Sequence, residues 1–219
     1  MASVGTRIRQ ALNLAVMVVR RPSELRYLPR WISGLRSNTV QLRLPWISYR
    51  AIDRLEEVVS RESTVFEFGG GGSTLWFAER CRSVVTVEHD PQWFPALEEL
   101  VGNLENVELI HETDQDDWSG YVNAIGHFPD AHFDLVVVDG RERVRCLEQA
   151  MPKVKPGGYL VLDNSDRARY QRALTFAAAW PSETFRGLVP TLADQGCTTI
   201  WQRPVDESSP AGAFSAGSD

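Results

Sequence analysis

The amino-acid sequence predicts an α/β fold with a doubly wound sheet, mostly parallel and closed by a C-terminal antiparallel hairpin. Two observations carry this prediction. Short apolar runs that suit strands alternate with helical patterns, which is typical of βαβ units with right-handed crossovers. One of these runs, residues 133–140, has an unbroken apolar core, as expected of a strand buried on both faces of a parallel sheet. A chain of 219 residues is long enough for one sizeable core.

The expected elements follow a regular order along the chain. A helix over residues 45–59 has apolar residues near period 3.6 and leads into a strand at 65–68. Further strands are expected at 83–87, 107–111, 133–140 and 159–162. Helices are expected at 75–80, 92–101, 141–151 and 167–180, and the closing hairpin at 184–189 and 198–202. This order puts the polar residues that follow the parallel strands on one rim of the sheet.

The chain divides into a basic N-terminal helix and arm at 1–44, a main domain at 45–203 and a polar, flexible tail at 204–219. Residues 1–54 carry ten arginines against two acidic residues, whereas the remainder carries 13 basic and 27 acidic groups. The acidic main domain argues against a nucleic-acid partner. The apolar run at 11–19 is too short to span a bilayer. It predicts either a helix that packs on the domain or on a second copy of the chain, or a basic helix on an anionic membrane.

Cysteine use and the N-terminal pattern bear on the compartment. Cys81, Cys146 and Cys197 form no CxxC pair, which favours a reducing compartment and argues against a disulfide scaffold or a zinc site. Arg20 and Arg21 stand where a signal peptide would carry small residues. We therefore expect a cytoplasmic protein, peripheral to the inner face of the membrane if the basic helix binds lipid.

A glycine turn, Gly69 to Gly72, follows the first expected strand and precedes a helix. Glycine allows φ > 0 and leaves the backbone amides open to a ligand. Glu88 comes 19 residues after Gly69, at the end of the next strand, where a carboxylate can accept hydrogen bonds from both hydroxyls of a ribose. No Gly-Lys-Ser/Thr motif follows the turn, which argues against a nucleoside-triphosphate loop. The turn and Glu88 predict an adenosine-containing ligand, either a nicotinamide dinucleotide or S-adenosylmethionine.

Four motifs in succession resemble those of class I S-adenosylmethionine-dependent methyltransferases. They lie at residues 65–78, 84–90, 133–140 and 155–164, and the resemblance covers about residues 45–203. It implies a Rossmann-like methyltransferase sheet with S-adenosylmethionine as the cofactor. The implied cofactor contacts are Glu67, Gly69, Gly70 and Gly71 for the methionine part, Glu88 for the ribose, Asp116, Asp117 and Trp118 for the adenine, and Ser73, His89 and Asp139 as further contacts.

A second group of polar residues follows the fourth and fifth expected strands. Asp139, Asp163 and Asn164 supply hard oxygen ligands that suit Mg²⁺ or Ca²⁺. Here the chain is similar to catechol-type O-methyltransferases, in which such residues hold a divalent metal that binds and acidifies the substrate hydroxyl. The other interpretation is that Asp163 and Asn164 cap the next helix and that Asp139 binds substrate or cofactor without a metal.

The chain departs from the catechol-type pattern at the general base. Those enzymes carry a lysine just after the position of Asp139, whereas this chain continues with Gly140 and Arg141. Arginine stays protonated and cannot take up the proton. We expect Asp139 to be catalytic, with Glu142 or His89 as the base, or with metal activation alone.

The expected methyl acceptor is a hydroxyl oxygen of a small molecule or glycan. Trp46 and Tyr49, on the helix before the glycine turn, are expected to line its pocket, with Arg141 and Arg167 as anion contacts. Two alternatives remain open. One is an NAD(P)-dependent oxidoreductase of Rossmann type, and the other is a non-catalytic cofactor-binding partner subunit that docks through its arginine-rich N-terminal segment.

Overall fold

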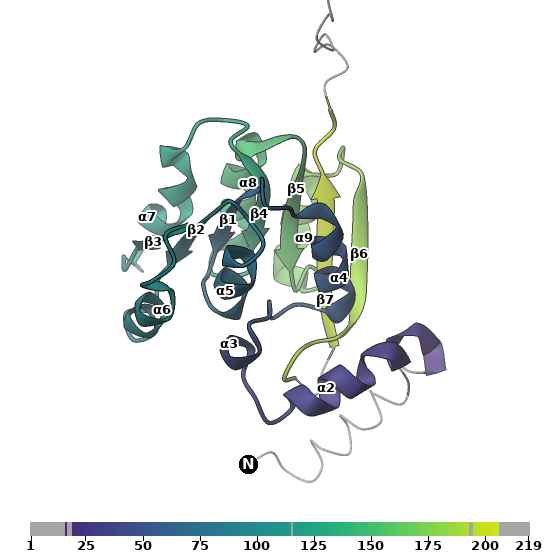
Figure 1. Ribbon diagram of the computed structural model, residues 1–219. Helices are drawn as coiled ribbons and strands as arrows, with labels where there is room; N and C mark the ends of the chain where they lie inside the picture. The colour runs from purple at the N-terminus through teal and green to yellow at the C-terminus, as the bar shows by residue number, and fades with distance from the viewer. Residues whose placement is uncertain (1–15, 17–18, 115, 193–194, 206–219) are drawn as a thin grey trace, which may run out of the picture.

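The computed structural model describes residues 16, 19–114, 116–192 and 195–205, and its centre is a seven-stranded sheet (Figure 1). The strand order is β3-β2-β1-β4-β5-β7-β6. Strands β1 to β5 are parallel, and β7 runs antiparallel between β5 and β6. The predicted fold class is confirmed. The strands are β1 Thr64–Phe68, β2 Ser83–Glu88, β3 Val107–His111, β4 Phe133–Val138, β5 Val154–Asp163, β6 Ser182–Leu188 and β7 Gln195–Gln202.

The order in which strands are added to the sheet reverses at β1, and this reversal places the polar residues that follow β1, β2 and β4 next to one another. The chain moves outward from β1 to β2 and β3 on one side, then returns to add β4 and β5 on the other. Phe68, the last residue of β1, is in register with Val87 and with Val138. The residues that come next, at positions 69, 88 and 139, are therefore neighbours at the switch point where ligands of such sheets bind.

Helices cover both faces of the sheet (Figure 1). On one face, α4 (Tyr49–Val58) and α5 (Gly72–Ala78) bury Ile52, Leu55 and Trp76 against the strands. On the other face, the core includes residues of α7 (Ser119–Asn123), α8 (Arg143–Ala150) and α9 (Gln171–Phe176). Helix α6 (Phe94–Val101) packs against α5. The 3-10 helices η2 (Ala124–His127), η3 (Met151–Lys153) and η4 (Ala168–Tyr170) complete this region.

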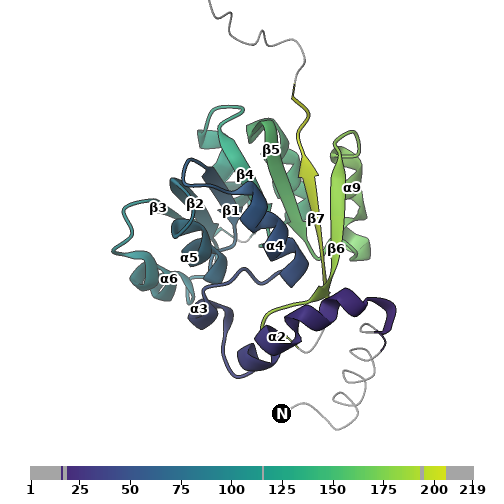
Figure 2. The same ribbon diagram turned by 45° about the vertical axis from the view of Figure 1, so that its right-hand side comes forward.

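The segment before α4, predicted to be an arm, packs on the main domain. It forms η1 (Pro22–Tyr27), α2 (Leu28–Gly34) and α3 (Thr39–Leu42), with α2 lying below β6 and β7 (Figure 2). Tyr27 and Trp31 are buried in the same core as α4. The Trp31 indole donates to the carbonyl of Leu192 at 2.7 Å, and Glu24 accepts from the Leu188 amide at 3.1 Å.

Most of the predicted basic helix lies outside the described residues, and so does most of the tail. The apolar run at 11–19 is described only at Val16 and Val19. Its membrane contact and its contact with a second copy of the chain stay predictions. Among the residues that the structure describes, no helix is both long enough and apolar enough to cross a membrane.

Several element boundaries differ from the sequence prediction. The helix expected from residue 45 begins at Tyr49, because the Ser48 hydroxyl accepts from the Ala51 amide at 3.3 Å and caps it there. The helix expected at 167–180 is η4 followed by the short α9. Helix α7 was missed, since its five residues are too few to show a period.

Candidate active site

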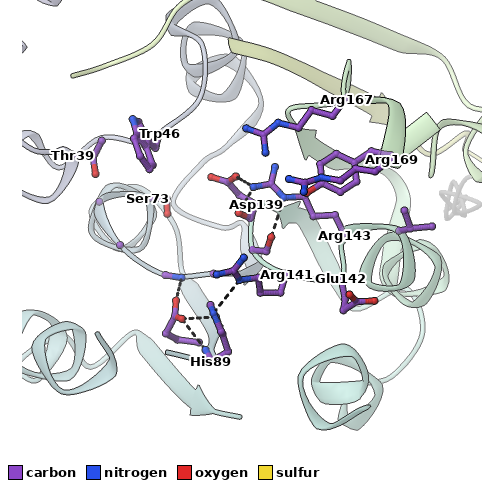
Figure 3. A pocket seen from close by; sticks show the side chains of 18 residues that line it. Thr39, Trp46, Ser73, His89, Asp139, Arg141, Glu142, Arg143, Arg167 and Arg169 are labelled. Atoms are coloured by element: carbon purple, nitrogen blue, oxygen red, sulfur yellow. Dashed lines mark hydrogen bonds and ion pairs between the residues drawn. The ribbon is translucent and has the colours of Figure 1, made fainter. Parts of the chain in front are cut away.

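A cavity of about 620 Å³ opens at the carboxyl ends of β1, β2 and β4 (Figure 3). Its walls come from the glycine turn, the residues after β2 and β4, the β5–α9 segment and the arm before α4. The lining residues are Thr39, Trp46, Gly69, Gly70, Gly71, Gly72, Ser73, Glu88, His89, Asp139, Gly140, Arg141, Glu142, Arg143, Val144, Arg167, Arg169 and Tyr170.

The glycine turn brings the backbone to the wall of the cavity. Gly69 has φ of +93°, a conformation that L side chains rarely adopt. A Cβ at Gly72 would lie 2.3 Å from the carbonyl oxygen of Thr39, so the glycine lets the arm cross the start of α5. A Cβ at Gly71 would meet nothing within 4 Å. A Cβ at Gly69, Gly70 or Gly72 would meet neighbouring atoms, so the turn is open only at its third glycine, Gly71.

Glu67 lies behind the turn, not in the cavity, so the prediction that it faces a ligand is wrong. Its side chain is enclosed and accepts hydrogen bonds from the hydroxyls of Thr74 and Thr86. The Thr74 hydroxyl in turn accepts from the Gly71 amide at 3.0 Å. Burial raises the pKa of Glu67 to about 7, and the hydroxyl hydrogen bonds oppose that rise. Glu67 therefore stabilises the glycine turn from within the core, through the Thr74 hydroxyl.

Glu88 stands at the other side of the turn and does line the cavity. Its Oε2 accepts from the Gly70 amide at 3.0 Å, and its Oε1 accepts from the amides of His89 and Asp90 at 2.8 and 2.9 Å. These bonds fix the carboxylate beside the glycines. Because each carboxylate oxygen has two lone pairs, Oε2 keeps one acceptor site for a ligand hydroxyl.

His89 is held between Glu88 and Arg141. Its Nδ1 lies 2.8 Å from Glu88 Oε1, and its Nε2 accepts from Arg141 Nε at 3.3 Å. The ring also packs against Trp118 and Tyr121, with centroid distances of 5.2 and 5.8 Å. These contacts hold the His89 ring against the wall of the cavity.

The residues predicted to contact adenine do not line the cavity. The Asp117 carboxylate accepts from the amide of Ser119, the first residue of α7, at 2.8 Å, and Asp116 is exposed. Trp118 is half-buried behind His89, with φ of +63°. Trp118 contacts the cavity wall through His89.

Arg143 lies between Asp139 and Asp163, the two carboxylates that were predicted to hold a metal. Its guanidinium is 2.8 Å from Asp139 Oδ1 and 3.7 Å from Asp163 Oδ2. It also donates to the backbone carbonyls of Asp139, Asp163 and Gly140 at 2.7, 2.6 and 3.0 Å. Burial and the charge of Asp163 raise the pKa of Asp139 to about 8, and Arg143 opposes that rise.

The predicted metal ligands do not fit a divalent cation. The Thr198 hydroxyl donates to Asp163 Oδ1 at 2.7 Å, and the Asn164 amide nitrogen donates to Asp163 Oδ2. Neither Asp163 nor Asn164 lines the cavity. In the described part of the chain, no three His, Cys, Asp or Glu side chains are grouped so that they could hold a metal. The Arg143 guanidinium supplies the positive charge that these carboxylates would otherwise take from a metal.

Comparisons with known proteins match the part of the chain that forms this site. A family model described as a methyltransferase domain matches residues 66–165, which span the glycine turn through Asp163. The chain contains a methyltransferase domain. The matched residues include the glycine turn, Glu88 and Asp139, from which S-adenosylmethionine was predicted as the cofactor. A search of curated proteins found no match.

Solved structures share the fold of the methyltransferase domain. An rRNA methylase from Streptococcus thermophilus is 16% identical, with 71% of this chain and 95% of that one covered and a TM-score of 0.55. A protein from Streptococcus mutans, assigned as a methyltransferase and solved with S-adenosylhomocysteine (SAH), is 13% identical, with 70% and 96% covered and a TM-score of 0.53. The N-methyltransferase NodS from Bradyrhizobium japonicum is 16% identical, with 71% and 95% covered and a TM-score of 0.50.

Of the residues predicted to contact the methyl acceptor, some line the cavity and one does not. Trp46, Arg141 and Arg167 line the cavity, as does Glu142 at the start of α8. The prediction for Tyr49 is wrong, because its side chain is fully buried and its ring stacks on Tyr27 at 5.5 Å.

Sequence reasoning missed Arg143, Arg169 and Tyr170 on the wall of the methyltransferase cavity. One signal for Arg143 was available, since it stands four residues after Asp139 and that spacing allows an ion pair. Its insertion between the ends of β4 and β5 depends on the tertiary fold. Arg169 and Tyr170 lie on η4, which was expected to be part of a longer helix.

Proposed function

We propose that this methyltransferase domain transfers a methyl group from S-adenosylmethionine to a hydroxyl oxygen of a small molecule or glycan. The observation that carries the proposal is the position of Asp139. It stands at the carboxyl end of β4, beside the glycine turn, with its side chain 26% exposed to the cavity and its pKa raised to about 8. A carboxylate with such a pKa can take a proton from a hydroxyl near neutral pH.

The cofactor side of the proposal rests on the glycine turn and Glu88. The open side of Gly71 and the remaining acceptor site on Glu88 fit a ligand that carries a ribose. When bound, S-adenosylmethionine supplies an electrophilic methyl group on a sulfonium. The new bond forms between that carbon and the acceptor oxygen, the C–S electron pair stays on sulfur to give SAH, and the hydroxyl proton goes to Asp139.

Asp139 is a better proton acceptor than the other two residues predicted for this role. The His89 Nε2 already accepts from Arg141. Asp139 adjoins the glycine turn, since a Cβ at Gly69 would lie 3.6 Å from the Asp139 carbonyl carbon. Arg143 holds the Asp139 carboxylate in place through a bond of 2.8 Å. No metal takes part in the proposed step, because the guanidinium fills the position between the two aspartates. Positioning of the two reactants supplies most of the rate enhancement.

The first test is calorimetry with SAH and with NAD on the full chain. We expect SAH to bind and NAD to bind at least tenfold more weakly, and the reverse order would contradict the proposal. The second test is transfer of label from S-adenosylmethionine to paired acceptors that differ only by a hydroxyl or an amine. Transfer to the amine alone would contradict the oxygen acceptor. SAH binding with no transfer to either class would favour the non-catalytic subunit.

A further inference from the structure

Two arginines on the cavity wall have no carboxylate partner. Arg167 and Arg169 follow β5, and both are exposed in the cavity. Among the described residues, neither guanidinium forms an ion pair with an acidic side chain within 4 Å. The charge of Arg167 does act on the buried Asp163, to which the Arg143 guanidinium lies at 3.7 Å. The Arg169 guanidinium rests over the Tyr170 ring, 4.8 Å from its centroid. Figure 3 shows both side chains on the same side of the cavity, away from His89.

This arrangement is unusual for a chain with a net charge of −6. Asp166, which directly precedes Arg167 in the sequence, forms an ion pair with Arg186 of β6 at 2.7 Å. Arg145, on α8, lies 3.6 Å from Glu142. Arg167 and Arg169 therefore remain unpaired on a segment where acidic residues are close by.

The carboxylates that line the cavity are already compensated. Asp139 is bonded to Arg143, Glu142 is close to Arg145, and Glu88 accepts three backbone amides. Their negative charge is therefore not available to Arg167 and Arg169. The side of the cavity formed by the β5–α9 segment carries an excess of positive charge, which attracts an anion.

We propose that Arg167 and Arg169 form an anion subsite for the methyl acceptor, so that the acceptor carries a carboxylate or a phosphate group as well as the hydroxyl. The inference rests on the proposed function. Guanidinium groups bind the oxygens of either anion through paired N–H donors, so both share one recognition chemistry. A phosphate has enough acceptor oxygens for two guanidinium groups, and a carboxylate can bind one guanidinium through both of its oxygens.

Trp46 limits the shape of such an acceptor. It is 51% exposed and lines the same cavity, and its indole nitrogen donates to the Pro190 carbonyl at 3.1 Å. The bond fixes the ring, so that it offers an apolar surface to a bound molecule. The acceptor class is therefore a hydroxy acid or a phosphorylated sugar with one apolar face.

The test is anion binding to the full-length protein, with inorganic phosphate and malonate as the two probes. Titrations are made with and without saturating SAH. We expect millimolar or tighter binding of at least one probe, and the preferred probe identifies the anion. The double variant Arg167→Met/Arg169→Met should weaken that binding at least tenfold and change SAH affinity less than threefold. Arg172→Met, an exposed arginine outside the cavity, is the matched control and should bind as the wild type does.

Two results would overturn the subsite. One is a wild-type protein that binds neither probe at 10 mM. The other is a double variant that binds SAH at least tenfold more weakly while anion binding is unchanged, since the arginines would then hold the cofactor's own carboxylate. Failure of the proposed function has a different signature. The wild type would not bind SAH, whereas the titration without SAH would still report on the anion.

Discussion

The Arg143 guanidinium lies 2.8 Å from the Asp139 carboxylate and 3.7 Å from that of Asp163, so that one buried cation serves both aspartates. Only 9% of the Arg143 side chain is exposed. Charges this far from water are stable only when they are paired and hydrogen-bonded. Arg143 therefore joins the ends of β4 and β5 at the site where the sequence suggested a metal.

Replacing Arg143 by methionine should destabilise the protein strongly. The carboxyl groups of Asp139 and Asp163 would lose their shared charge and hydrogen-bond partner in a largely buried position, which costs on the order of 3–5 kcal/mol. The measurement is the free energy of unfolding from urea titration at pH 7. Arg145→Met on the same helix, whose side chain is 45% exposed, is the control and should cost under about 1 kcal/mol. Equal costs for the two variants would contradict the role assigned to Arg143.

Divalent cations should not stabilise the wild-type protein. A metal bound only by the folded state would raise the melting temperature as its concentration increases. We expect 10 mM Mg²⁺ or Ca²⁺ to move the melting temperature no more than the same ionic strength of NaCl does. The NaCl sample is the control for screening. A saturable rise that chelator reverses would show that a metal displaces Arg143.

Asp139→Asn should abolish most methyl transfer and leave the cofactor site intact. The amide cannot accept the hydroxyl proton, and a lost general base costs roughly 10²–10⁴-fold in rate. SAH affinity should change less than about threefold, measured by calorimetry on the same samples. Asp130→Asn, an exposed position outside the cavity, should leave the rate unchanged. A normal rate in the Asp139 variant would remove this residue as the proton acceptor.

The sheet could be predicted from the sequence because local apolar patterns determine it. The strands at 83–88 and 107–111 are short runs rich in β-branched and apolar residues, and they pair as expected. The glycine turn and Glu88 could also be predicted, since φ > 0 at Gly69 and a carboxylate at a strand end follow from residue type and spacing.

The predictions that were wrong concern residues whose surroundings are set by contacts between segments distant in the sequence. Nothing near Tyr49 in the sequence shows that Tyr27 covers it, and residues 22–44 have too weak a period to predict the helices that bring Tyr27 there. Asp163 and Asn164 have the residue types of metal ligands, and only the fold places Arg143 between Asp163 and Asp139. A local sequence motif does not show that the positive charge beside these carboxylates comes from an arginine on another element, helix α8.

Glu88→Gln should weaken SAH binding. The amide keeps one acceptor oxygen but loses the charge and one of the two carboxylate acceptors, and a hydrogen bond to a charged group contributes about 1.5–3 kcal/mol. We expect about a 10- to 100-fold higher Kd by calorimetry. Glu108→Gln on β3, an exposed residue outside the cavity, is the matched control and should bind SAH normally. Unchanged binding in the Glu88 variant would mean that the ligand does not use this carboxylate.

The raised pKa of Glu67 should make stability depend on pH. The buried carboxyl has a pKa of about 7, against 4.5 for an ordinary glutamate, so the folded state binds more protons than the unfolded state between these values. The stabilisation is therefore complete below about pH 4.5 and is lost as the pH rises to about 7, a change of about 3 kcal/mol. Glu67→Gln, which stays neutral, removes this contribution. The measurement is the difference in free energy of unfolding between wild type and variant, from urea titrations at pH 4.5 to 8. The wild type should lose stability relative to the variant across this range, and two curves that run parallel would show that Glu67 is ionised in the folded protein at acidic pH.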